Sequence, residues 1–73
     1  MRTRDSDFLL KFGNHFQLVR KKRGFTQEDL AYNTEISLSQ IARIETGRIN
    51  PTVCTLKILA QGMEVELKDL FDF

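Results

Sequence analysis

Two helix-start signals lie close together in the middle of the chain. Thr26 opens the sequence Thr-Gln-Glu-Asp, and Ser37 opens Ser-Leu-Ser-Gln. A hydroxyl at such a position accepts a hydrogen bond from an early helical amide, and the acid or amide three residues later can return one. The segment 33–36 interrupts the apolar pattern between the two signals, and Gly47 follows the second. This spacing predicts two short helices, over about 26–33 and 37–46, joined by a short turn.

The rest of the chain also has helical spacing. Phe8, Phe12, Phe16 and Val19 recur on one helical face, on a segment that Gly24 ends. A turn at Asn50-Pro51 precedes a predicted fourth helix over about 53–61, and a short fifth helix is predicted after residue 65. The residues expected to pack inside these last two helices are Val53, Cys54, Leu56, Leu59, Ala60, Leu67, Leu70 and Phe71. Nothing alternates as a strand would, so we predict an all-α fold of five short helices.

The length and composition exclude several classes of protein. A chain of 73 residues buries on folding only about 60% of the surface that its unfolded form exposes. This size predicts one small domain, over 8–73. The polar segment 1–7 is predicted to be an arm that precedes the domain. The single cysteine excludes an intramolecular disulfide and a zinc site built on paired cysteines. No apolar run is long enough to cross a bilayer, and the charged start is not a signal peptide. We therefore expect a cytoplasmic protein without a metal, cofactor or small-molecule ligand.

The net charge of +1 conceals an uneven distribution. Residues 1–50 contain nine basic and six acidic side chains, a balance of +3, whereas residues 51–73 have a balance of −2. The run Arg20-Lys-Lys-Arg23 supplies much of the positive charge. Basic residues at the end of a helix also interact favourably with its dipole, so this run alone does not indicate a binding site.

The predicted helix over 37–46 has two different faces. Ile41 and Ile44 form its buried stripe, and Ser39 and Arg43 lie on the opposite face, one turn apart. Arginine can bind guanine, glutamine can bind adenine, serine can bind either, and an apolar group can contact the thymine methyl. Two short helices joined by a tight turn form a helix-turn-helix, here over about 26–46. The pattern therefore favours a helix that enters the major groove of double-stranded DNA.

At this point the sequence resembles a known family. The motifs that carry the resemblance are Phe12-Gly13, Gly24-Phe-Thr-Gln-Glu-Asp-Leu-Ala31, Ile36-Ser37, Ile44-Glu-Thr-Gly47, Pro51, Leu59-Ala60 and Leu70-Phe71. They are similar to the Xre/phage-repressor-type (Cro/cI-like) helix-turn-helix family, over about residues 10–72. The resemblance implies a five-helix, lambda-repressor-like fold. Small members of this family from bacteria and phages include restriction–modification controller proteins, antitoxins and repressors.

The family pattern implies roles for individual residues. Base contacts fall on Leu38, Ser39 and Arg43, with Gln40 beside a base or a phosphate. Phosphate contacts are implied for four polar residues around the helix-turn-helix: Gln27, Ser37, Arg48 and Asn50. A structural ion pair is implied between Arg20 and Glu45, which would keep Arg20 away from DNA.

The chain also departs from the family pattern. Glu35 stands where the family often has glycine in the turn, so either the turn is rearranged or Asn33 takes the left-handed conformation. Glu64 also replaces a frequent glycine. Leu38 is unusual at a base-reading position, and it reads a methyl group or packs inward. His15 is interpreted as exposed or structural, because no metal ligands or catalytic partners stand at a suitable spacing.

The sequence thus predicts a transcriptional regulator, not an enzyme. A single domain reads too few base pairs to select one site, so we expect a homodimer on a pseudo-palindromic operator. The expected interface consists of the apolar residues near the end of the chain: Val65, Leu67, Leu70, Phe71 and Phe73. The alternative is an antitoxin-type or other protein-interaction module, in which these apolar residues bind a different protein.

Overall fold

The computed structural model describes residues 4–73, which form four α-helices and one 3-10 helix. The elements in chain order are α1 Ser6–Lys22, α2 Gln27–Thr34, α3 Leu38–Glu45, α4 Val53–Gly62 and η1 Leu67–Phe71. The predicted all-helical class is confirmed, and these residues contain no strand. The fifth segment is a 3-10 helix and not the α-helix that the sequence predicted. The segment has only five residues, which is close to the short lengths to which 3-10 helices are usually limited.

The polar arm predicted for residues 1–7 lies partly outside the described residues. Ser6 and Asp7 from this segment form the first turn of α1, and the Asp5 side chain caps that helix by accepting a hydrogen bond from the Phe8 N–H at 3.0 Å. Within residues 4–73, no helix combines the length and the apolar character that a membrane crossing needs.

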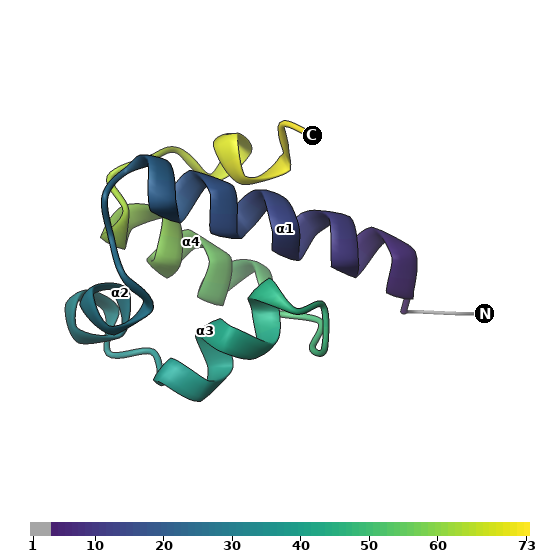
Figure 1. Cartoon of the computed structure of the whole chain (residues 1–73), viewed down its shortest axis with the longest axis horizontal. Helices are drawn as coiled ribbons and strands as arrows, with labels where there is room; N and C mark the ends of the chain where they lie inside the picture. Colours follow the sequence, from purple (N-terminus) through teal and green to yellow (C-terminus); the bar gives the residue numbers. More distant parts are fainter. Residues whose placement is uncertain (1–3) are drawn as a thin grey trace.

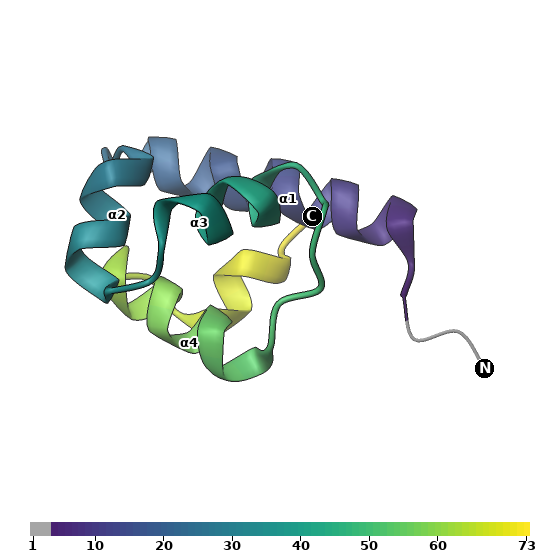
Figure 2. The same cartoon turned by 90° about the horizontal axis from the view of Figure 1, so that it is seen from below.

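Helix α1 lies between η1 on one side and α3 on the other (Figure 1). Helix α2 packs against α3 and α4, and α4 also packs against η1, which closes the bundle (Figure 2). The shared core consists of side chains from all five elements and the segment between α4 and η1: Phe12, Phe16, Leu30, Ile41, Ile44, Leu56, Leu59, Ala60, Met63 and Leu70. The bundle therefore holds α3 at the surface by its isoleucine stripe.

Four residues predicted to be buried are exposed, and one of them is Phe71 of η1, which is 44% exposed. Phe8 is 46% exposed and Val53 is 69% exposed, and Cys54 is also exposed. Phe8 and Val53 stand in the first turns of α1 and α4, where part of the helix circumference has no neighbouring helix. Leu9 takes the buried position at the start of α1 instead.

The predicted helix caps are present at both central helices. The Thr26 hydroxyl accepts a hydrogen bond from the Asp29 N–H at 2.9 Å, and the Asp29 carboxylate accepts one from the Thr26 N–H at 3.0 Å. The backbone N–H of Thr26 and then its hydroxyl hold the pKa of Asp29 below its usual range. At α3, the Ser37 hydroxyl accepts a hydrogen bond from the Gln40 N–H at 3.1 Å. These local bonds determine where the two helices begin.

The turn between α2 and α3 is made by Glu35. Its φ is 60°, which is the left-handed conformation, and its N–H donates to the carbonyl of Ala31 at 2.9 Å. The alternative that Asn33 takes this conformation is wrong, because Asn33 lies inside α2. Glu64 also has a φ of 60°, after α4. Both glutamates that replace a frequent glycine therefore adopt the conformation that glycine favours.

Replacing Glu35 by glycine should raise the free energy of unfolding by about 0.5–1 kcal/mol. Glycine removes the steric cost of the left-handed conformation, and its greater freedom in the unfolded chain offsets part of the gain. Urea unfolding followed by circular dichroism measures the change. The matched control is Glu28→Gly inside α2, which should lose about 1 kcal/mol. Equal destabilisation by both substitutions would contradict this account of the turn.

Candidate nucleic-acid interface

Helix α3 presents one polar face to solvent. Leu38, Ser39 and Arg43 are exposed and Gln40 is half-buried, whereas Ile41 and Ile44 are buried. Of the two alternatives left open for Leu38, inward packing does not occur, because this residue is 42% exposed. The structure thus brings the four residues predicted to read bases onto one short exposed helix.

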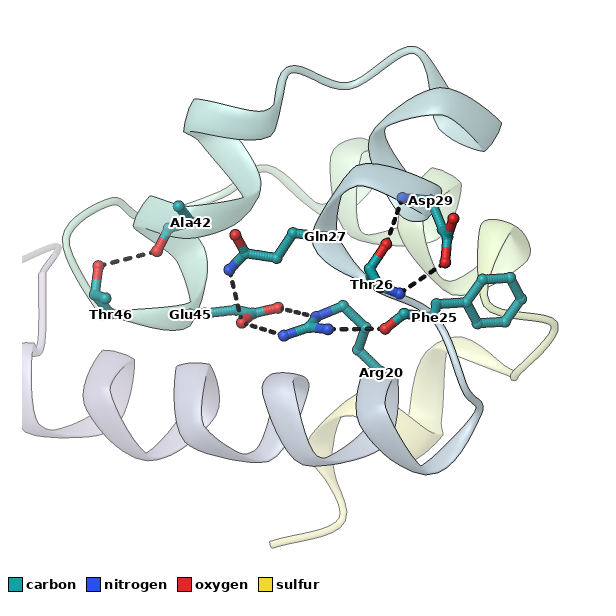
Figure 3. A network of polar contacts seen from close by, with 8 residues as sticks. All are labelled: Arg20, Phe25, Thr26, Gln27, Asp29, Ala42, Glu45 and Thr46. Carbon is teal, nitrogen blue, oxygen red and sulfur yellow. Dashed lines mark hydrogen bonds and ion pairs between the residues drawn. The ribbon is translucent and has the colours of Figure 1, made fainter.

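A buried ion pair fastens α3 to α1 (Figure 3). The Arg20 Nε donates to the Glu45 Oε2 at 2.6 Å, and the Arg20 Nη2 donates to Oε1 at 3.0 Å. The remaining Arg20 nitrogen, Nη1, donates to the Phe25 carbonyl at 2.8 Å. The Arg20 side chain is 6% exposed and the Glu45 side chain is 2% exposed, so Arg20 cannot reach a phosphate. The guanidinium therefore joins α1, α3 and the segment that leads into α2.

Gln27 joins the same network. Its Nε2 donates to the Glu45 Oε1 at 3.1 Å, and its side chain is half-buried (Figure 3). The sequence predicted Gln27 as a phosphate contact and contained no signal for this bond, since 18 residues separate the partners. The bond orients the Gln27 amide at the start of α2. Ser37, also predicted as a phosphate contact, is exposed and caps α3 with its hydroxyl.

The loop after α3 carries the other predicted phosphate contacts. Arg48 and Asn50 are both exposed there. The Arg4 side chain also reaches this loop, where its Nη2 donates to the carbonyls of Gly47 at 3.2 Å and Arg48 at 3.0 Å. Sequence reasoning missed this contact, because no local pattern connects positions more than 40 residues apart. The loop therefore has a basic residue from the start of the chain beside it.

The C-terminal residues predicted to form a dimer interface have different surroundings. Leu70 is fully buried in the core, so its assignment to the interface is wrong. Val65 and Leu67 are half-buried and pack against the core. Phe71 is 44% exposed and Phe73 is 52% exposed. Leu70 faces inward because η1 packs against α1 and α4, and Leu70 is the residue of η1 that joins their core.

Phe71 and Phe73 belong to an apolar surface that extends over other elements. The Phe73 ring lies 5.6 Å from that of Phe8, and the Phe71 ring lies 5.1 Å from that of Phe12. Beside them is a groove lined mostly by apolar residues: Phe8, Leu9, Phe12, Asn50, Pro51, Val53, Leu56 and Phe71. We call these residues, together with Phe73, the apolar surface. It lies against the end of the loop that carries Arg48 and Asn50.

The environment of His15 is structural. His15 is half-buried, its Nε2 lies 2.8 Å from the Asp69 carbonyl, and its ring lies 5.5 Å from that of Phe73. It therefore holds η1 against α1. Across residues 4–73, no three histidine, cysteine or acidic side chains are grouped as a metal site would require.

The family model for helix-turn-helix proteins matches residues 17–70. The transcriptional regulator SlrR of Bacillus subtilis (strain 168) is 39% identical over 61 residues, which are 82% of this chain and 40% of SlrR. The control protein C.BamHI of Bacillus amyloliquefaciens is 31% identical over 65 residues, covering 88% of this chain and 80% of that protein. This chain thus spans well under half of SlrR but most of C.BamHI.

A solved structure has the same fold. It is the restriction–modification controller protein C.Esp1396I, a tetramer in complex with its natural 35-base-pair operator, which is 32% identical. The TM-score is 0.82, and the match covers 93% of this chain and 90% of that one. The family model matches most of the chain, and the structure has a capped α2 followed in the chain by an exposed α3. This chain therefore belongs to the helix-turn-helix family.

Proposed function

We propose that this chain is a sequence-specific transcriptional regulator that binds double-stranded DNA with α3 in the major groove. The observation that carries the proposal is the exposed face of α3, which holds Leu38, Ser39 and Arg43 while its opposite face is fastened in the core. Such a face offers a guanidinium for guanine, a hydroxyl for a base edge and an apolar group for a methyl. The relatives named as regulators and control proteins support this proposal.

The residues before and after α3 are suited to contacts with the DNA backbone. Gln27, whose amide is oriented by Glu45, stands at the first residue of α2, and Ser37 precedes α3. Arg48 and Asn50 stand on the loop beyond it. Helix-start amides attract phosphates, and side chains at these places would set the register of α3 on the duplex. Because Glu45 is buried against Arg20, it places no free negative charge near the phosphates.

We further infer that the chain acts as a homodimer, with a second copy on the apolar surface. Phe8, Val53, Phe71 and Phe73 are each more than 40% exposed there, and a continuous apolar surface is typical of an interface. A two-fold dimer would place two copies of α3 about 34–36 Å apart on neighbouring half-sites. A regulator of this kind would act in the cytoplasm of a bacterium, at the nucleoid.

A random-sequence binding selection at defined salt tests the proposal. We expect enrichment of a pseudo-palindromic sequence, and native mass spectrometry of the complex should show two or more copies of the chain per duplex. Recovery of random sequences would overturn specific DNA binding. A monomeric mass on DNA and at tens of micromolar protein would overturn the homodimer. In that case the apolar surface would have to bind a different protein, as the antitoxin-type alternative requires.

Replacing Arg43 by alanine should relax base preference at one position of each half-site by about 1–3 kcal/mol, because one bidentate base contact is lost. Replacing Arg48 by alanine should instead weaken binding to all sequences alike, because phosphate contacts carry no base information. Competition titrations with singly substituted duplexes separate the two results. An unchanged base preference in Arg43→Ala would show that the reading face of α3 is assigned wrongly.

A further inference from the structure

Arg4 occupies an unusual position for a residue near the start of the chain. Its Nη2 donates to the carbonyl oxygens of both Gly47 and Arg48, at 3.2 and 3.0 Å. The start of α1 and the loop after α3 lie at the same end of the molecule (Figure 1). The neighbouring acid, Asp5, is occupied in capping α1, and among residues 4–73 no acid forms an ion pair with Arg4. The positive charge of Arg4 is therefore held beside the loop without being neutralised.

The position of these two carbonyls makes the contact significant. They lie just beyond the C-terminal end of α3, the end at which helix carbonyls concentrate partial negative charge. Carbonyl oxygens at that end would repel the phosphates of a duplex in contact with the loop. Arg4 places a cation over them and uses one nitrogen to do so. Arg4 is exposed, and among residues 4–73 both of its hydrogen bonds come from Nη2, so its Nε and Nη1 donors make none there.

We propose that Arg4 is a phosphate-binding residue, held by the Gly47 and Arg48 carbonyls so that its remaining N–H donors bind a phosphodiester of the DNA backbone. This inference rests on the proposed function, and it adds a cation to the contacts that Arg48 and Asn50 would make. The Gly47 and Arg48 carbonyls orient the guanidinium before DNA arrives, which lowers the entropy lost on binding. Arg4 then acts as a second positive side chain on the backbone that flanks the reading face of α3.

The test compares Arg4→Ala, Arg4→Gln and Arg4→Lys with the wild-type chain. Each protein is titrated by fluorescence anisotropy onto the selected operator duplex and onto a scrambled duplex, over a series of potassium chloride concentrations. The control is Lys68→Ala, which removes one positive charge from η1, on the opposite side of α1 from α3. Lys68 is 81% exposed, and thermal unfolding of every variant confirms that it is folded.

The slope of log K against log salt reports the number of phosphates contacted. We expect Arg4→Ala and Arg4→Gln to reduce this slope by about 0.9 per subunit, with the same fold-loss of affinity on both duplexes. Arg4→Lys should keep most of the slope, and Lys68→Ala should match the wild type.

Three results would overturn the proposal: unchanged binding in Arg4→Ala, weaker binding with an unchanged slope, or a loss confined to the operator. The second result would make Arg4 a structural clamp for the loop, and the third would make it a base contact. These outcomes differ from failure of the proposed function, in which the wild-type chain itself shows no preference for any duplex.

Discussion

Replacing Glu45 by alanine is expected to lower the free energy of unfolding by about 3–5 kcal/mol. The substitution leaves the Arg20 guanidinium buried, with only its bond to the Phe25 carbonyl remaining. It also removes the acceptor for the Gln27 amide. A single small domain has a total stability of about 5–15 kcal/mol, so this one change removes a large share of it. Urea unfolding at neutral pH measures the loss.

Two controls separate the buried pair from ordinary surface charge. Lys68 and Glu66 form an exposed pair at 3.4 Å, and Lys68→Ala should cost less than about 1 kcal/mol. The double substitution Arg20→Met with Glu45→Leu should recover most of the stability, because well-packed apolar side chains can replace a buried ion pair. A loss in Glu45→Ala no larger than that in Lys68→Ala would mean that the pair does not fasten α3 to the core.

Replacing Gly13 by alanine should destabilise the fold by about 1–3 kcal/mol, although alanine is the better helix former. A Cβ on Gly13 would collide with the carbonyl oxygen of Ile44 and would lie 2.7 Å from that of Glu45. Both obstacles are backbone atoms of α3, so no side-chain rotation can relieve the contact. Helix α1 would have to move away from α3, and the exposed face of α3 would shift relative to the rest of the bundle.

The matched control for Gly13→Ala is Asn14→Ala, which places the same side chain one residue later on the exposed side of α1. It should be neutral or slightly stabilising, since it changes helix propensity alone. Thermal and urea unfolding compare the two variants. Stabilisation by Gly13→Ala would show that α1 and α3 are not held in backbone contact, which would also weaken the account of how α3 is positioned.

Several errors of sequence reasoning have the same origin. Periodicity correctly identified helical faces at Phe12, Phe16 and Ile41, but it also assigned Phe8 and Val53 to the interior. A helical face is buried only where another element covers it, and Phe8 and Val53 instead line a groove at the surface. Leu70 is the opposite case, since its apolar character suited both an interface and a core, and only the packing of η1 distinguishes them.

Patterns along the chain correctly predicted the four α-helices and the two faces of α3. Helix caps act over three residues, as in the bonds of Thr26 with Asp29 and of Ser37 with the Gln40 backbone N–H. The helical period acts over about four residues. These interactions are local, so they can be read along the chain. They locate Ser39 and Arg43 on an exposed face without any knowledge of the rest of the molecule.

The packing of the helices determines which polar groups are used within the fold. It binds the Gln27 amide to Glu45, 18 residues away, and brings Arg4 to the carbonyls of Gly47 and Arg48, more than 40 residues away. It also places Gly13 against the α3 backbone. Contacts between distant residues depend on how the helices pack together, and packing is a property of the whole core. For that reason the sequence identified the exposed polar face of α3, whereas the arrangement of charge around it became visible only in the folded chain.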